Sequence, residues 1–117
     1  MTKEEIIEFG LSLGATYLDF PFSQNSGAID YAVLRHLKNK KIFAIIYERN
    51  ENLIVALKQN PEISQELREF FVDVTPAFHM NKTHWNDIRL GGDVPDDILQ
   101  KMIENSYDLI KPKRKVK

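Results

Sequence analysis

The sequence predicts an α+β fold, a single two-layer domain in which an antiparallel sheet has helices packed on one face. Two observations predict this class. The chain has 117 residues, which suits one domain with one core. Along it, the apolar residues change from helical spacing to strand-like alternation and back. The expected order is helix, three strands, helix, one or two strands and helix, over residues 1–110 and with no internal repeat.

The N-terminal segment is predicted to form an amphipathic helix. Thr2 and Glu5 have the spacing of a capping box, in which each side chain satisfies a backbone N–H group of the other residue. Apolar residues follow at helical spacing, at Ile6, Ile7, Phe9, Leu11 and Leu13. Gly14 supplies a stop, and residues 19–29 have the turn-forming composition of an exposed loop.

A three-stranded meander is predicted next. The pattern alternates over residues 31–37, and residues 38–40 make a tight connection in which Asn39 tolerates a left-handed conformation. Residues 41–48 are apolar on both faces, as expected for a central strand. Residues 53–57 form the third strand after a second hairpin turn.

The second half of the chain is predicted to contain two helices around a segment of mixed pattern. Pro61 marks the entry of the first, because proline suits the first helical position. Its buried side is expected to carry Ile63, Leu67, Phe70 and Phe71. Thr75-Pro76 interrupts any strand, whereas residues 85–90 are able to pair as one. The last helix starts at Pro95. Its apolar stripe contains Ile98, Leu99, Met102, Ile103, Tyr107 and Ile110.

The composition excludes several kinds of chemistry. The chain has no cysteine, which rules out disulfides, thiolate nucleophiles and cysteine-based zinc or iron–sulfur sites. Its longest apolar run, residues 42–47, is too short to cross a bilayer, and its acidic N-terminus does not resemble a signal peptide. We therefore expect a cytoplasmic protein with no membrane contact and no cofactor.

The net charge of −1 hides an asymmetry between the domain and its tail. Residues 111–117 hold five of the 16 basic residues and no acid, which leaves 11 basic against 17 acidic residues, a net charge of −6, in residues 1–110. A short polycation buries no apolar surface, so we expect the tail to be disordered. It suits contact with phosphates or a role in nuclear localisation. It is also typical of a mobile, solubilising end, which we favour.

One segment in the second half of the chain concentrates titratable and aromatic residues. His79 and His84, with Asp87 nearby, offer the nitrogen and oxygen ligands that zinc uses. Lys82 lies between the histidines and would repel a cation, and the spacing does not match a helical zinc motif. We therefore predict no metal site. We expect His79 and Trp85 to be half-buried residues whose ring N–H groups bond to the backbone.

Signals of catalysis are weak. Ser23, Ser26 and Thr75 are available as hydroxyl nucleophiles, but none lies in a nucleophile elbow, and no glycine-rich loop leads into a helix to cradle phosphate. We predict no catalytic residues and a protein that is not an enzyme.

A nucleic-acid interface is the function that the basic residues suit best. Cations on one surface would contact phosphates, while aromatic and amide groups would reach bases. The candidates for phosphate contact are Lys40, Lys41, Lys58, Lys82 and Arg89, and those for closer contacts are Asn81, His84 and Trp85. The negative charge of the domain opposes broad electrostatic capture. Lysines in a turn also serve to keep a hairpin soluble.

A resemblance adds to these patterns. The series that runs from Thr75-Pro76 through His79-Met80-Asn81-Lys82 to His84-Trp85-Asn86 resembles the signature of the MmcQ/YjbR family of small bacterial proteins. Other segments over about residues 5–110 resemble the family in order and spacing: Asp19-Phe20-Pro21-Phe22, Lys41-Ile42-Phe43-Ala44, Leu57-Lys58 followed by Pro61-Glu62 and Leu67-Arg68-Glu69, Val94-Pro95-Asp96 and Ser106-Tyr107-Asp108-Leu109. Ala77 departs from the family pattern, which frequently has glycine there, and Lys40-Lys41 replaces the usual Gly-Lys turn.

The resemblance implies a domain of the order helix, three strands, helix, two strands and helix, similar to frataxin-like and secretion-chaperone-like domains. Members of this family are commonly labelled DNA-binding, and no catalytic residue set is established for them. The resemblance therefore favours a non-enzymatic binding protein with DNA as its partner, which we expect to be a monomer. Two alternatives remain open. One is a protein-binding adaptor that uses an exposed sheet face or an edge strand, and the other is an enzyme or metal site at His79 and His84.

Overall fold

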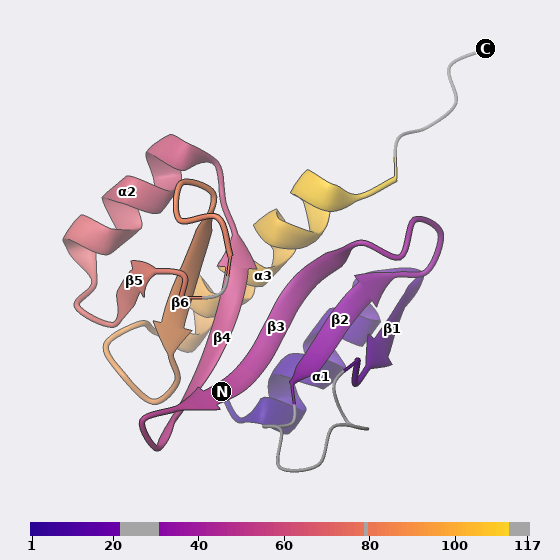
Figure 1. Cartoon of the computed structure of the whole chain (residues 1–117), viewed down its shortest axis with the longest axis horizontal. Helices are drawn as coiled ribbons and strands as arrows, with labels where there is room; N and C mark the ends of the chain where they lie inside the picture. The colour runs from indigo at the N-terminus through magenta and orange to yellow at the C-terminus, as the bar shows by residue number, and fades with distance from the viewer. Residues whose placement is uncertain (22–30, 79, 113–117) are drawn as a thin grey trace.

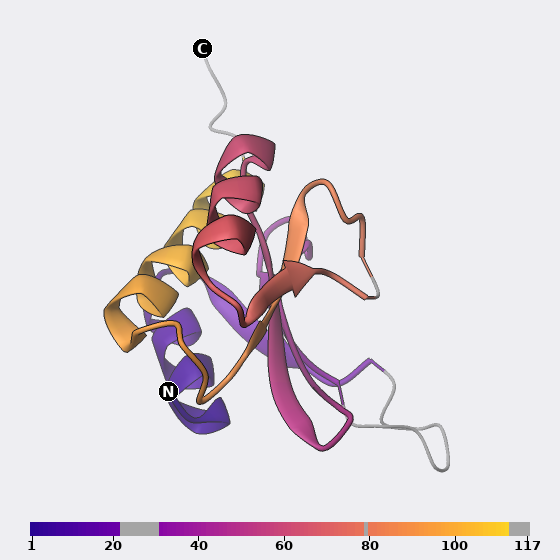
Figure 2. The same cartoon turned by 90° about the vertical axis from the view of Figure 1, so that its left-hand side faces the viewer.

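The computed structural model describes residues 1–21, 31–78 and 80–112. The helices and strands of these residues follow in the order α1 (Lys3–Ser12), β1 (Thr16–Asp19), β2 (Ala32–His36), β3 (Ile42–Arg49), β4 (Asn52–Lys58), α2 (Pro61–Phe70), β5 (Val74–Pro76), β6 (Trp85–Arg89) and α3 (Asp96–Ile110). The strands form one antiparallel sheet in the order β1-β2-β3-β4-β6-β5. The helices lie on one face of this sheet (Figure 1, Figure 2). The predicted two-layer α+β fold is confirmed.

The structure adds one strand, β1, to the predicted order. It pairs with β2, from Thr16 opposite His36 to Asp19 opposite Val33. All four of its residues are half-buried, so it shows neither the alternation nor the apolar run by which a strand is recognised in a sequence. Asp19, expected to begin a loop, therefore ends an edge strand. Most of the remaining expected loop, from residue 22, lies outside the described residues.

The prediction that Thr75-Pro76 interrupts any strand was wrong. Both residues belong to β5, which lies at the edge of the sheet and pairs with β6. Proline is tolerated there because an edge strand needs hydrogen bonds on only one side. The strand predicted over residues 85–90 is confirmed as β6, which ends at Arg89.

Apolar side chains pack on both faces of the sheet. The face covered by helices holds the main core, and the middle of α3 is buried in it, as the apolar stripe predicts. Ser106 fastens α3 to the sheet, because its hydroxyl donates to the carbonyl of Phe43 at 2.5 Å and accepts from the N–H of Lys58 at 2.9 Å. The opposite face holds a smaller buried cluster of Tyr47, Ile54, Ala56, Ala77 and Trp85.

Helix α2 is oriented differently from the prediction. Ile63 and Phe70, expected to be buried, are 43% and 79% exposed, whereas Ser64 is buried. The cause is a polar contact with β6. Asn86 Nδ2 donates to the carbonyl of Ser64 at 3.3 Å, and Arg68 Nε donates to Asn86 Oδ1 at 2.6 Å. Ser64 and Arg68 are one helical turn apart on the same side of α2, so these bonds turn that side toward β6 and leave the neighbouring apolar stripe partly open.

The turn between β2 and β3 has its left-handed residue at Lys40, with φ of 60°, and not at Asn39. The Asn39 side chain has another role. Its Oδ1 accepts from the N–H of Lys41 at 3.0 Å, and its Nδ2 donates to the carbonyl of Ile110 at 3.0 Å. The hairpin is therefore attached to the C-terminal end of α3.

Candidate functional site

The loop between β5 and β6 carries the signature residues, and hydrogen bonds fix its second half. Asn81 Oδ1 accepts from the N–H of Thr83 at 2.9 Å, and the Asn81 carbonyl accepts from the N–H of Trp85 at 2.9 Å. The guanidinium of Arg68 donates to the carbonyls of Lys82 and Trp85. Asn81 thus closes a turn, which is a structural role. The contact with bases predicted for Asn81 is a separate role.

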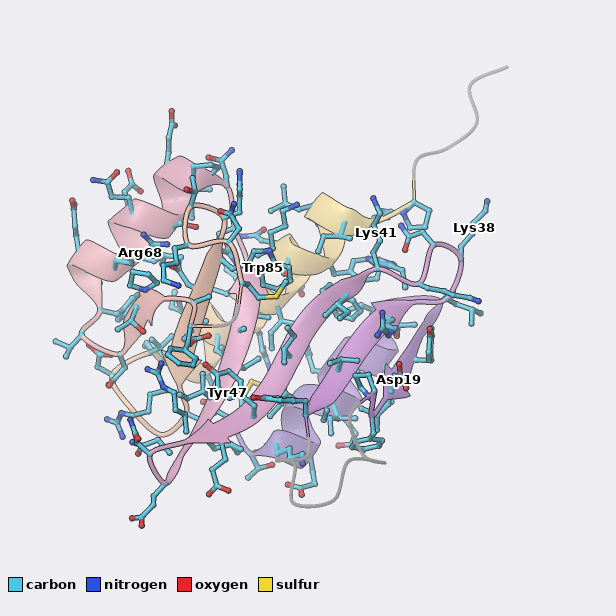
Figure 3. All side chains as sticks on the ribbon, in the orientation of Figure 1. Asp19, Lys38, Lys41, Tyr47, Arg68 and Trp85 are labelled. Carbon is cyan, nitrogen blue, oxygen red and sulfur yellow. The ribbon has the colours of Figure 1, made fainter. Side chains whose placement is uncertain are left out.

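Arg68 is a residue of this site that the sequence patterns do not reveal. Arg68 lies on α2 (Figure 3). Through Asn86, which is fully buried, it joins α2 to β6, and through the carbonyl of Lys82 it holds the loop. The sequence offers two signals: Arg68 is the one basic residue of α2, whose other charged residues are acidic, and it belongs to the segment Leu67-Arg68-Glu69 that resembles the family. Asn86 of the signature therefore has a structural function as well.

Trp85 lies in the smaller buried cluster and is 7% exposed. The half-buried Met80 packs against the same cluster. Trp85 is therefore buried more deeply than the half-buried position predicted for it. A buried indole offers no open face on which a base can stack, so this burial favours a structural role. Trp85 also contributes to the lining of the cavity described below.

A buried tyrosine and a buried carboxyl group pair beneath the loop. Tyr47 Oη donates to Asp87 Oδ2 at 2.5 Å, and the N–H of Phe78 donates to the same oxygen at 3.0 Å. Burial raises the pKa of Tyr47, and the bond to Asp87 raises it further, so Tyr47 remains a neutral donor. The other oxygen, Oδ1, is buried and has no hydrogen-bond partner among the described residues. The sequence patterns place Tyr47 in a core strand and do not pair it with Asp87.

Three lysines meet at one end of the molecule, which we call the lysine end: Lys41 at the start of β3, Lys58 at the end of β4 and Lys111 after α3. Together with Trp85 and apolar neighbours they line a cavity of about 370 Å³. The register explains part of this arrangement, because Lys58 pairs directly with Trp85. The bond from Asn39 to the end of α3 explains the rest, because it brings the hairpin that carries Lys41 to Lys111 (Figure 1, Figure 3).

No acidic side chain of the described residues is in direct contact with the lysine end, although Asp108 lies one helical turn before Lys111. No acidic residue lines its cavity, and none of Lys41, Lys58 and Lys111 has a carboxylate oxygen within 4.0 Å in that part of the chain. Lys40 and Lys82, the other two predicted lysines, are exposed on neighbouring turns and do not line the cavity.

Arg89 does not belong to the lysine end. It lies at the opposite end of β6 from Trp85 and forms an ion pair with Asp73, with Nε to Oδ1 at 2.8 Å and Nη2 to Oδ2 at 3.2 Å. This bond holds the pKa of Asp73 below its usual value. Because a carboxylate already occupies its guanidinium, Arg89 is a poor candidate for phosphate contact.

The histidine pair is described only in part. His84 is half-buried, and its carbonyl accepts from the N–H of Gln59 at 2.7 Å. His79 lies outside the described residues. Among the residues that are described, no group of three or more histidine, aspartate and glutamate side chains is placed to hold a metal ion. The same residues include no helix that is long and apolar enough to span a membrane.

The adaptor hypothesis requires an exposed apolar surface or an open edge strand. The edge strands are short, four residues in β1 and three in β5. The sheet face away from the helices has a cavity of about 390 Å³ with apolar residues from β2 and β3 in its lining. The most exposed large apolar side chains, Val72 and Phe70, lie at the end of α2 and just beyond it.

A six-stranded antiparallel sheet with three helices on one face defines a class of small α+β domains. Solved structures with this fold include the following two. A crystal structure of a Pseudomonas syringae protein superposes with a TM-score of 0.81 at 28% identity, covering 95% of this chain and 100% of that one. The Deinococcus radiodurans protein DR2400 gives a TM-score of 0.81 at 27% identity, covering 96% and 80%.

The chain belongs to the YjbR family, whose model matches residues 11–109. It is 28% identical to the uncharacterized protein YjbR of Escherichia coli (strain K12) over 107 residues, which cover 92% of this chain and 85% of that protein. It is 32% identical to the uncharacterized protein YyaQ of Bacillus subtilis (strain 168), with 95% and 99% coverage. The family resemblance of the signature series is therefore confirmed.

Proposed function

We propose that this protein is a non-enzymatic DNA-binding protein that contacts phosphates with its lysine end. The observation that carries the proposal is the meeting of Lys41, Lys58 and Lys111 around one cavity with no acid in its described lining. An ammonium group that has no carboxylate in contact with it pairs with a phosphate without first breaking an ion pair, and each phosphate that is neutralised releases condensed cations from the nucleic acid.

The start of the basic tail, Lys111 and Pro112, lies at the same cavity. The described chain ends at Pro112, which lines the same cavity, and residues 113–117 of the sequence add four more basic residues. The acidic residues of the domain include Glu4 and Glu5 at the start of α1 and three glutamates on α2. None of these glutamates lines the cavity of the lysine end, and a local group of cations is able to attract a polyanion even where the net charge of the domain is negative.

The expected mode of binding is electrostatic and independent of sequence. Because Trp85 is buried, it cannot stack on bases, and lysine ammonium groups recognise phosphate as point charges. Affinity should therefore fall steeply with salt, and duplex and single-stranded DNA should both bind.

The experiment measures binding of the full chain to labelled duplex and single-stranded DNA from low to physiological salt. The double variant Lys41→Glu/Lys58→Glu should weaken binding by at least about tenfold more than Lys101→Glu/Lys3→Glu, which makes the same change in net charge elsewhere. Equal weakening by the two pairs would show that only net charge matters. Absence of binding at low salt, or complete loss when residues 113–117 alone are removed, would contradict a role of the domain, because that truncation leaves Lys41, Lys58 and Lys111 in place.

We also propose that the protein acts as a monomer in the cytoplasm. Light scattering during gel filtration gives the mass of the particle, and a mass of two chains at micromolar concentration would contradict the first part.

A further inference from the structure

Helix α2 has an open apolar stripe beside α3. Ile63, Leu67, Phe70 and Phe71 of the α2 segment, with Ile98 of α3, line a groove of about 560 Å³. The two helices lie next to each other on the same face of the sheet (Figure 2). The groove is thus a surface between helices and is separate from the lysine end, with which it shares no lining residue.

The exposure of this stripe is unusual for a folded domain. Phe70 is 79% exposed, and its ring lies 4.8 Å from that of Phe71 in an edge-on arrangement. Leu67 and Phe71 are half-buried and pack against the main core, so they form a fixed floor, while Ile63 and Phe70 stand at the sides. Apolar side chains that stay open in this way mark surfaces that bind another molecule.

The charges around the groove select the kind of partner. Glu66 and Glu69 line it, and no basic residue of the described chain does so. Arg68, the one cation of α2, is bonded to Asn86 and to the carbonyl of Lys82, on the side of the helix that faces β6. An apolar floor with acidic edges repels nucleic acid and attracts apolar side chains flanked by cations.

We propose that the groove between α2 and α3 binds a basic amphipathic helix of a partner protein, with its apolar side chains against Leu67 and Phe71 and its lysines or arginines beside Glu66 and Glu69. Helices recognised in this way present apolar residues at positions i, i+3, i+4 and i+7. The length of α2, ten residues or about 15 Å, matches about three turns of such a partner. This inference does not depend on DNA binding, because the groove and the lysine end are different surfaces.

The test uses the full chain and three synthetic helical peptides of about 14 residues, or four turns. The first has leucines at the helical positions given above and lysines elsewhere. The second replaces its lysines by glutamates, and the third replaces its leucines by alanines. Binding is measured by NMR chemical shifts of the backbone amides, which report both the affinity and the place of contact.

We expect the leucine–lysine peptide to shift amides of residues 63–71 and of α3, and the two other peptides to bind at least about tenfold more weakly. Phe70→Ser should lower the affinity for the leucine–lysine peptide by about tenfold, as truncation of an apolar anchor does. Its matched control is Leu37→Ser, because Leu37 is 59% exposed on the β2–β3 hairpin. Glu66→Lys/Glu69→Lys should also weaken binding, and Glu8→Lys on α1 should not.

Several outcomes would overturn the proposal. Equal binding of the glutamate peptide would refute the charge argument, and equal binding by the Phe70→Ser variant would refute the groove. The proposal would also be refuted if no peptide at millimolar concentration shifted the amides of residues 63–71 and of α3. If the protein instead forms a dimer that Phe70→Ser converts to a monomer, the occupant is a second copy of this chain and the proposed partner is wrong.

Discussion

Tyr47 Oη lies 2.5 Å from Asp87 Oδ2, and both residues are 2% exposed. The pair joins β3 to β6 across β4, because Tyr47 is opposite Ile54 and Ile54 belongs to the strand that pairs with β6. A hydrogen bond to a buried carboxyl group matters mainly through the cost of losing it, since the group left behind has no water to replace the donor.

Tyr47→Phe should lower the free energy of unfolding by about 1–3 kcal/mol, because Asp87 loses its hydroxyl donor while it stays buried. Urea unfolding followed by fluorescence of Trp85 measures this change. A double-mutant cycle with Asp87→Asn isolates the pairwise contribution. A loss no larger than a few tenths of a kcal/mol would show that the pair contributes little to stability.

His36 should make the stability depend on pH. It is 2% exposed, its Nε2 lies 2.9 Å from the carbonyl oxygen of Tyr107, and burial lowers its pKa from the ordinary value of 6.5. In the unfolded chain His36 takes up a proton near that value, and in the folded protein only at lower pH. The unfolded state therefore binds more protons in this window, so the free energy of unfolding falls as pH falls from 6.5 toward the folded pKa.

The measurement is urea unfolding at a series of pH values above and below 6.5. The His36→Gln variant is the comparison, since glutamine has no titrating group. The variant should lose stability overall and should show a smaller slope against pH in this window. An unchanged slope would assign the pH dependence to other groups.

Arg68→Ala should loosen the signature loop. The side chain donates to Asn86 and to the carbonyl of Lys82, and hydrogen bonds of charged donors contribute about 1.5–3 kcal/mol. Hydrogen exchange of the amides of Trp85 and of the turn before it should become faster than in the wild type. Arg68→Lys should rescue little, because an ammonium cannot reproduce the planar fork. Full rescue by lysine would show that charge alone fixes the loop.

Arg89→Ala should leave DNA affinity close to that of Lys101→Ala, which removes the same charge elsewhere. The reason is that the Arg89 guanidinium is already paired with Asp73. Lys58→Ala should have a larger effect and should reduce the slope of log affinity against log salt by about one. If Arg89→Ala weakens binding as much as Lys58→Ala, the ion pair opens on binding and the interface extends along β6.

Local patterns in the sequence predict much of the fold, and they do so where neighbouring residues decide the outcome. The capping box is confirmed, with Glu5 N–H donating to Thr2 Oγ1 at 3.1 Å and Thr2 N–H donating to Glu5 Oε1 at 2.8 Å. The central strand and the last helix are also where the apolar periodicity places them. Strand β1 is not predicted by such patterns, because its four half-buried residues show no alternation of apolar and polar positions.

The signature series can be recognised in the sequence, but the structural roles of its residues cannot. Nothing in the sequence indicates a partner for Asn86, whereas in the structure Asn86 is buried and bonded to Arg68 and to the carbonyl of Ser64. Trp85 is as consistent with a base contact as with a core position until its burial is known.

By itself, the sequence determined the α+β class, the family, the absence of cysteine chemistry and the contrast between an acidic domain and a basic tail. The tertiary structure alone decided which charges act together. It brings Lys41, Lys58 and Lys111 to one cavity, pairs Arg89 with Asp73, and leaves Phe70 open. The physical reason is range: capping and periodicity depend on residues a few positions apart, whereas these contacts join segments that only strand pairing and helix packing bring together.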